Sequence, residues 1–266
     1  MNRYPLQLRL PEGEIEAYIE APEGPVRLMD LAYQLLGLSS TVAELGARAA
    51  ERQGERVSCR AGCAACCRQL VPLSAPEAAM IHELVEELPE PRRGQIKARF
   101  AAAVARLRET GLLEPLSDGG DPLLHRSEEA YFRLGIPCPF LENGNCSIYE
   151  ARPSRCREYL VFTPASHCDD PYRNAVGRLP VSVRLNEALT WLWAAMTRQP
   201  PGLVPLTLAL DWAEKTGPLR LVAANAEAMI EHISRDIEAI AGNIEREVLA
   251  SAKRLSDAGT RSTPDA

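Results

Sequence analysis

The chain has 266 residues, of which 25% are charged and 46% hydrophobic, and its formal net charge is −6 at pH 7. This length allows a substantial buried core in one large domain or two small ones. The moderate negative charge gives no electrostatic case for binding nucleic acid, which usually requires a basic surface.

The N-terminal sequence, MNRYPLQLRLPEGEIEAYIE, lacks the apolar region and the small-residue cleavage site of a secretory signal. No run reaches about 18 apolar residues, so the sequence predicts no membrane span. We therefore expect a cytoplasmic protein, in a reducing compartment where stable disulfides are uncommon.

Alternating apolar residues predict a β-hairpin over residues 6–19. They lie on both sides of a Pro-Glu-Gly turn and are Leu6, Leu8, Leu10, Ile15, Ala17 and Ile19. Because a lone hairpin is only marginally stable, its apolar face must rest on helices. Residues 26–53 have helical spacing, and we expect Gly37 to divide them into two helices, the second capped by Thr41 and Glu44.

Further helices are predicted along the rest of the chain. Ser74 and Glu77 have the spacing of a capping box, which opens a helix to about Leu88. Other helices are expected at 92–109, 126–134, 182–197 and 219–254, with a loop at 116–122 and irregular, ligand-presenting chain over 135–175.

The helix predicted at 219–254 carries an apolar stripe with steps of three and four residues. The stripe consists of Met229 or Ile230, Ile233, Ile237, Ile240, Ile244 and Val248. Such a stripe is more often a core-packing face than a cofactor site, and a dimerising or partner-binding helix is the alternative. The tail from Ser256 is predicted to be disordered.

These elements predict a single domain over residues 1–255. Its fold class is mainly α with a small N-terminal β-hairpin. An irregular cysteine-rich metal-binding core at 56–175 is flanked by the hairpin and helices at 1–55 and by helices at 176–255.

All eight cysteines lie between positions 59 and 168. The first group has the pattern C-x3-C-x2-C-C and the second is spread out; together they are Cys59, Cys63, Cys66, Cys67, Cys138, Cys146, Cys156 and Cys168. Cysteines that merely filled an apolar core would not crowd in this way, and a disulfide framework suits small secreted domains. We therefore favour metal ligation, because thiolates are soft ligands for zinc, Fe–S clusters or copper(I).

Cys66 and Cys67 are neighbours in the chain, and consecutive side chains point in different directions. The pair therefore indicates either two metal centres that share one loop, or one ligand beside a spare thiol. Several arginines close to cysteines would suit an anionic metal–thiolate centre, although each taken singly is more often a solvated surface residue. They are Arg60, Arg68, Arg152, Arg155 and Arg157.

The second cysteine group has a more defined frame, IPCPFLENGNCSIYEARPSRCREYLVF. Gly144 allows a tight turn before Cys146. Ser147 and Glu150 have capping-box spacing and predict a one-turn helix that Pro153 ends. Cys146 would then lie at a helix N-terminus, where the helix dipole lowers the pKa of a thiol.

The order C-x3-C-x2-C-C, then C-P-F-L, then G-x-C-x-I-Y-x-x-R-P-x-x-C-R resembles the YkgJ-type cysteine-cluster family, a zinc- or iron-chelating domain. The resemblance covers residues 59 to about 168. It implies that the cluster ligands are Cys59, Cys63, Cys66, Cys67, Cys138, Cys146 and Cys156, with Cys168 closing the set. Relatives include flagellin lysine N-methylases. Most members of the family have no established activity, so the resemblance implies a metal site more firmly than a reaction.

His167 adjoins Cys168 and is an alternative ligand, although a lone histidine is more often structural. The sequence contains no P-loop, H-E-x-x-H, G-x-S-x-G or dinucleotide-binding motif, so it identifies no catalytic residue. The leading hypothesis is an Fe–S or iron centre held by both cysteine groups. The alternatives are a structural zinc module that organises an interaction surface, and a protein-modifying enzyme.

Overall fold

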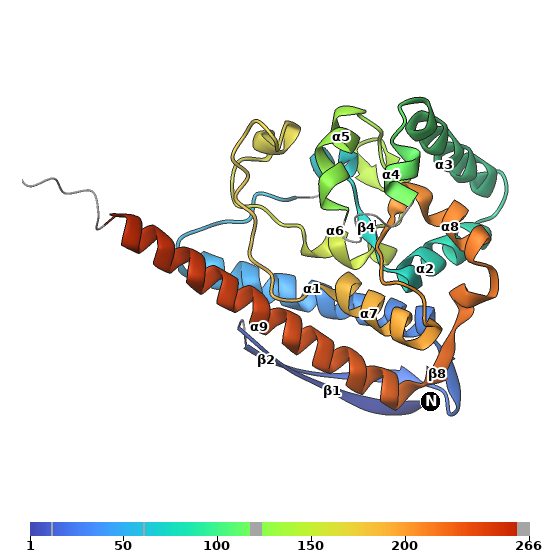
Figure 1. The fold of residues 1–266 in the computed structure, drawn as a ribbon, viewed down its shortest axis with the longest axis horizontal. Helices are drawn as coiled ribbons and strands as arrows, with labels where there is room; N and C mark the ends of the chain where they lie inside the picture. The colour runs from blue at the N-terminus through green and yellow to red at the C-terminus, as the bar shows by residue number, and fades with distance from the viewer. Residues whose placement is uncertain (12, 61, 118–123, 260–266) are drawn as a thin grey trace, which may run out of the picture.

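The fold is mainly helical with a small antiparallel hairpin at the N-terminus, as the sequence predicts (Figure 1). The computed structural model describes residues 1–259 apart from positions 12, 61 and 118–123. Its α-helices are α1 (Leu28–Arg52), α2 (Ala75–Glu86), α3 (Arg92–Glu109), α4 (Leu113–Ser117), α5 (Glu128–Arg133), α6 (Ser154–Glu158), α7 (Leu185–Thr197), α8 (Ala209–Thr216) and α9 (Ala226–Gly259).

The strands of the described residues pair antiparallel, two by two. The pairs are β1 (Asn2–Leu10) with β2 (Gly13–Ala21), β3 (Pro25–Arg27) with β8 (Ala223–Asn225), β4 (Pro72–Leu73) with β7 (Val204–Pro205), and β5 (Leu141–Glu142) with β6 (Asn145–Cys146). Short 3₁₀ turns connect them: η1 (Ala65–Arg68), η2 (His125–Ser127), η3 (Tyr149–Ala151), η4 (Ala165–Asp169), η5 (Leu206–Leu208) and η6 (Gly217–Leu221).

The N-terminal hairpin follows the predicted alternation. Leu6 pairs with Ala17 and Leu8 with Ile15, which places these apolar side chains on one face. Leu6 and Leu8 are each only 1% exposed, because α9 packs across β1 and covers that face (Figure 1). The hairpin therefore rests on a helix, as its marginal stability requires.

Helix α1 runs unbroken from Leu28 to Arg52, so the predicted division at Gly37 is wrong. A glycine costs a helix interior about 1 kcal/mol, but burial of Leu36 and Leu38 on either side of Gly37 offsets that cost. Thr41, predicted to cap a second helix, instead donates its hydroxyl to the carbonyl of Gly37 over 3.1 Å.

The C-terminal helix begins at Ala226, not at 219 as predicted. The chain before it forms η6 and then β8, whose pairing with β3 could not be read from local sequence. The side chain of Asn225 accepts a hydrogen bond from the backbone N–H of Ala228 over 3.1 Å and so caps α9. Helix α8 and the helical turn α4 were not predicted, and most of the loop predicted at 116–122 lies outside the described residues.

The apolar stripe of α9 is a core-packing face over its first half. Met229, Ile230, Ile233 and Ile237 are buried against the hairpin, α1 and α7. The side chain of Val248 lies outside the described residues. The helix continues to Gly259, beyond the predicted start of the tail at Ser256, and residues 260–266 are not described.

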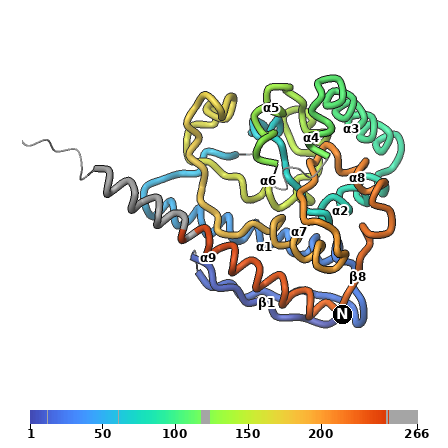
Figure 2. Tube along the Cα trace, in the orientation of Figure 1, coloured from blue at the N-terminus to red at the C-terminus, as the bar shows by residue number. Residues whose placement is uncertain are grey.

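Helices α2, α3, α4, α5 and α8 lie on the other side of α1 and α7 from the hairpin (Figure 2), and two further apolar clusters hold them together. One joins α2, α3 and α8 to Phe140, and the other joins the end of α3 to α4 and α5. Cys138 and Ile148 pack against the first of these clusters, which fixes the second cysteine group to the helices.

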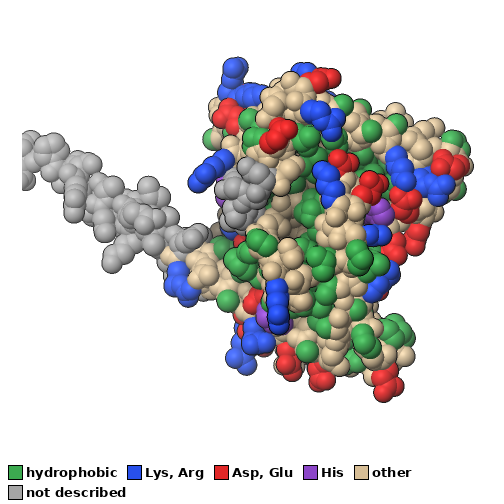
Figure 3. All heavy atoms as spheres, turned by 45° about the vertical axis from the view of Figure 1, so that its right-hand side comes forward, with side chains coloured by type: hydrophobic (Ala, Val, Ile, Leu, Met, Phe, Trp, Pro, Cys, Tyr) green, Lys and Arg blue, Asp and Glu red, His purple; other side chains and the backbone are tan. Residues whose placement is uncertain are grey.

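On the face drawn in Figure 3, acidic and basic side chains are interspersed among apolar ones. No helix in the described part of the chain has the length and apolar character needed to cross a membrane.

Candidate metal centre

The first cysteine loop, residues 58–70, is fixed to the chain between Cys156 and Cys168 of the second cysteine group. The backbone N–H of Ser58 donates to the carbonyl of Val161 over 2.8 Å. Cys66 and Cys67 lie in the 3₁₀ turn η1, which turns the chain so that both belong to the wall of one cavity.

The two cysteine groups are joined directly through the backbone. The N–H of Cys138 donates to the carbonyl of Cys67 over 2.7 Å. Gly62 and Gly144 both have positive φ, and a Cβ atom at Gly144 would lie 3.9 Å from the carbonyl oxygen of Gly62. The tight turns of the two groups therefore lie next to each other, although about 80 residues separate them in sequence.

A cavity of about 540 Å³, here called the cysteine cavity, lies between the two groups. Of the eight predicted ligands, the cavity is lined by Cys59, Cys63, Cys66, Cys67, Cys138, Cys146 and Cys156. Cys168 does not line it. This residue is buried in η4, which packs on η1, and is close enough to Cys59, Cys63 and Cys66 to interact with them electrostatically.

The donor chemistry of the cavity fits a thiolate-bound metal, since its polar lining is dominated by soft sulfur ligands. Among the described side chains, no three of the types His, Cys, Asp and Glu already stand at the spacing that holds a single ion.

Cys146 does not lie at a helix N-terminus, so that prediction is wrong. It belongs to β6, where it pairs with Leu141, and the following 3₁₀ turn starts only at Tyr149 without a side-chain cap from Ser147. Burial raises the pKa of the Cys146 thiol instead of lowering it. The local Ser-x-x-Glu spacing was overridden by the β5–β6 hairpin.

Other thiols of the cavity also favour their protonated form. Burial raises the pKa of Cys59 and Cys156, and that of Cys138 to about 12. A hydrogen bond with Cys67, together with burial, raises the pKa of Cys66. A metal must displace these protons to bind, so its affinity rises with pH.

Of the five arginines predicted to surround the centre, only Arg60 and Arg152 line the cysteine cavity. Arg152 stacks on Tyr149, with 3.8 Å from its Cζ to the ring centroid, and its charge partly opposes the effect of burial on the Cys146 thiol. Arg157 instead donates to the Ser40 hydroxyl over 2.8 Å and to backbone carbonyls. Arg68 is exposed and Arg155 faces a second pocket.

The helix that carries Cys156 is held by a buried carboxylate that sequence reasoning assigned only to a local cap. Glu77 forms the predicted capping box with Ser74, and its Oε2 accepts bonds from the N–H and hydroxyl of Ser74. Its Oε1 accepts hydrogen bonds from Ser154, the first residue of α6. The N–H of Ser154 donates over 2.8 Å and its hydroxyl over 2.7 Å. One carboxylate therefore ties the start of α2 to the start of α6.

A second buried acid, Glu158, lies at the other end of α6. It accepts hydrogen bonds from the Ser39 hydroxyl over 2.8 Å and from the N–H of Leu185 over 3.3 Å, which links α6 to α1 and α7. Burial raises its pKa to about 7. Its place in the sequence, two residues after Cys156, gave no signal of this burial.

His167 is not placed as a ligand. Its Nδ1 lies 2.8 Å from the carbonyl of Ala175, and the residue does not line the cysteine cavity. It therefore organises the chain that follows Cys168.

Residues 58–169 match a family model, CxxCxxCC, described as "Putative zinc- or iron-chelating domain". This stretch of the chain is therefore similar to that cysteine-cluster family. The matched CxxCxxCC domain begins one residue before Cys59 and ends one residue after Cys168, so it contains all eight cysteines. Searches of curated proteins and of solved structures found no match.

The extent of the CxxCxxCC domain agrees with the geometry. Its last cysteine, Cys168, lies in η4, which packs on η1, and is close enough to the first cysteine, Cys59, to interact with it electrostatically. The hairpin, α1, α7 and α9 lie outside the match and support it through α6, which packs against α1 and α7.

Proposed function

We propose that the CxxCxxCC domain holds an iron or iron–sulfur centre in the cysteine cavity. The observation that carries the proposal is that seven thiols from two distant sequence groups line one cavity. A structural zinc ion binds four ligands, so this number exceeds what one such ion takes and favours a polynuclear centre or two centres.

The residues around the thiols suit such a centre. The walls between the cysteines include Phe140, Ile148 and Leu206, which exclude water and strengthen the interaction of a metal with its ligands. Arg60 and Arg152 offset the negative charge of several thiolates. Iron in either form supplies one-electron redox chemistry, which zinc does not.

Because Cys66 and Cys67 are neighbours in the chain and both line the cysteine cavity, we propose a division of roles within the pair. One sulfur binds the metal, and the other remains a thiol that donates to it. This arrangement avoids the strain of placing both consecutive side chains on one ion.

The direct test is anaerobic purification of the full chain, followed by analysis for iron, zinc and acid-labile sulfide and by a visible absorption spectrum. Iron with labile sulfide and a brown colour is the expected result for a cluster, and iron without sulfide would indicate a mononuclear or oxo-bridged site. Stoichiometric zinc without visible absorbance would refute the iron proposal in favour of a structural zinc module.

Cysteine variants test whether the two groups share one site. Cys63→Ser and Cys146→Ser are each expected to lose most of the bound metal and to lower the melting temperature. Ser147→Ala is a matched control, because Ser147 adjoins Cys146 but is exposed. Full metal content and unchanged melting in both cysteine variants would show that the shared site is wrong.

A further inference from the structure

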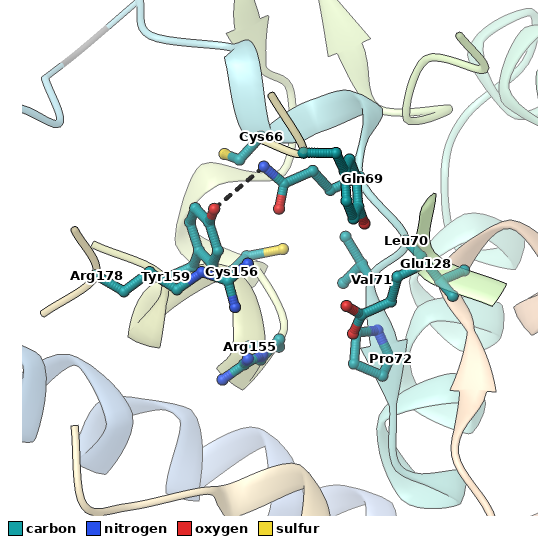
Figure 4. A pocket seen from close by; sticks show the side chains of 11 residues that line it. Cys66, Gln69, Leu70, Val71, Pro72, Glu128, Arg155, Cys156, Tyr159 and Arg178 are labelled. Atoms are coloured by element: carbon teal, nitrogen blue, oxygen red, sulfur yellow. Dashed lines mark hydrogen bonds between the residues drawn. The ribbon is translucent and has the colours of Figure 1, made fainter. Parts of the chain in front are cut away.

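A second pocket adjoins the cysteine cavity, and Figure 4 shows the side chains that line this second pocket. It encloses about 50 Å³, and four residues line both spaces: Cys66, Val71, Cys156 and Tyr159. These four residues therefore form part of the wall between the two. A molecule in this second pocket, here called the arginine pocket, would lie next to two of the proposed metal ligands.

Polar groups from separate elements converge on the arginine pocket. The side-chain amide of Gln69 donates to the hydroxyl of Tyr159 over 3.2 Å (Figure 4). The guanidinium of Arg178 stacks over the Tyr159 ring, with 5.0 Å from its Cζ to the ring centroid. Arg155, from α6, is half-buried in the wall, while Arg178 lies at the exposed rim.

Neither of these two guanidinium groups forms an ion pair within the described chain, although Arg155 lies close enough to Glu158 to interact with it electrostatically. Several arginines elsewhere have ion pairs: Arg27 with Asp30 and Glu83, Arg92 and Arg99 with Glu142, Arg133 with Asp170, and Arg184 with Glu187. Within the described chain, neither Arg155 nor Arg178 has a carboxylate within 4.0 Å or a side-chain hydrogen bond. A guanidinium stays charged, and its planar fork of donors matches a carboxylate.

A single carboxylate stands on the opposite side of the pocket. Glu128 lies across from Arg155 and Arg178 in Figure 4, and its Oε1 is 3.3 Å from the Nδ1 of His125. The pocket thus presents two positive charges against one negative charge. Its small volume admits a compact anionic group and no bulky ligand.

We propose that the arginine pocket binds the carboxylate group of a small organic acid between Arg155 and Arg178. That this carboxylate lies beside a metal centre rests on the proposed function, whereas its binding to the two guanidiniums does not. The chemistry would suit a free acid or an acidic side chain of a protein, and the experiment separates these sources.

The probes are acetate and the blocked amino acid N-acetyl-glutamate amide, titrated into the full chain and followed by ligand-observed saturation-transfer NMR. Arg155→Gln and Arg178→Gln should each weaken acetate binding by about tenfold or more, since each removes charge-assisted hydrogen bonds. Arg178→Gln alters only the exposed rim, so its effect does not depend on refolding of the wall. Arg173→Gln is the matched control, because Arg173 is exposed and lies outside the pocket lining.

Saturable acetate binding that both pocket variants weaken and the control keeps would support the proposal. If N-acetyl-glutamate amide binds as well as acetate, an acidic side chain is the source; if acetate alone binds, a free acid is. No saturable binding to the wild type, or equal binding to all three variants, would overturn it. So would binding of methylammonium in place of acetate, because Glu128 would then be the binding group.

Metal content is measured on the same samples. Acetate binding by protein that contains no iron would leave the pocket proposal intact and refute the iron proposal. Protein that contains iron but does not bind acetate would refute the pocket proposal and leave the iron proposal intact.

Discussion

In the layer formed by the β1–β2 hairpin, α1, α7 and α9, leucine and isoleucine side chains close a continuous apolar core. In the CxxCxxCC domain, short turns and strands surround a cavity of about 540 Å³ lined by thiols. Burial of apolar area stabilises the first region by itself. The second region depends on a few polar links and, in our proposal, on the metal that the thiols bind.

The comparison shows how one chain can combine a rigid support with a site that responds to its ligand. Helix α6 connects the two regions, since it carries Cys156 and packs against both α1 and α7. Glu77 and Glu158 fix its two ends. The position of Cys156 is therefore set by the apolar layer before any metal binds.

Metal removal should produce the largest difference between the two regions. Thiolate metal sites contribute apparent free energies on the order of 10 kcal/mol, and that contribution is confined to the chain that supplies the ligands. We expect hydrogen exchange after chelation to lose protection over residues 58–70 and 138–169. Amides in α1, α7 and the first half of α9 should keep their protection.

The measurement is hydrogen–deuterium exchange with mass spectrometry on the same protein before and after chelation. An equal loss of protection in both regions would contradict the proposed independence of the apolar layer. Unchanged protection over both cysteine groups would show that the metal does not organise them.

Substitution of Glu77 should affect both regions, because its carboxylate accepts four hydrogen bonds from Ser74 and Ser154. In Glu77→Gln an amide NH₂ would face donors on one of the two serines and leave them unpaired while buried. We expect the free energy of unfolding to fall by about 3 kcal/mol, and metal affinity to fall with it because α6 is released.

Glu86→Gln on the same helix is the matched control for this variant. Glu86 is partly exposed and pairs with Lys97 at the surface, so its loss should cost less than about 1 kcal/mol. Chemical denaturation and metal titration of both variants measure the difference. Equal small effects would show that Glu77 does not couple α2 to α6.

The fold was predictable from sequence where local pattern and tertiary packing agree. The hairpin alternation and the spacing of the α9 stripe are both matched by burial. Gly37 was misread because the local penalty of one glycine is smaller than the burial of its leucine neighbours. The start of α9 was misread because β8 pairs with β3, almost 200 residues earlier, which no local rule detects.

The candidate site was predictable in composition but not in its connections. The confinement of the cysteines to residues 59–168 identified seven residues that line the cavity, although the eighth, Cys168, does not line it. The bond from Cys138 to Cys67 and the link from Glu77 to Ser154 depend on the folded chain and have no sequence signature. Cys146 was misplaced because a capping-box spacing was trusted where a hairpin forms.

The smallest predicted effect concerns Asp236 on α9, an acidic side chain whose pKa is raised by burial. Asp236 is half-buried beside the apolar stripe; burial raises its pKa, and His232, whose Nε2 lies 3.3 Å away, partly opposes the effect. A carboxyl group with a raised pKa contributes stability that is present below its unfolded pKa and is lost as the pH rises through its folded pKa. Asp236→Asn should therefore raise stability at neutral pH by less than about 1 kcal/mol, and have progressively less effect as the pH falls into the acid range.

Glu231→Gln removes the same charge from the exposed face of α9 and should not show this pH dependence. Denaturation curves across the acid to neutral range would contradict the prediction if Asp236→Asn were the less stable protein at pH 7. That result would mean that the ion pair with His232 outweighs the cost of burying the charge, and that this layer, too, relies on a specific polar link.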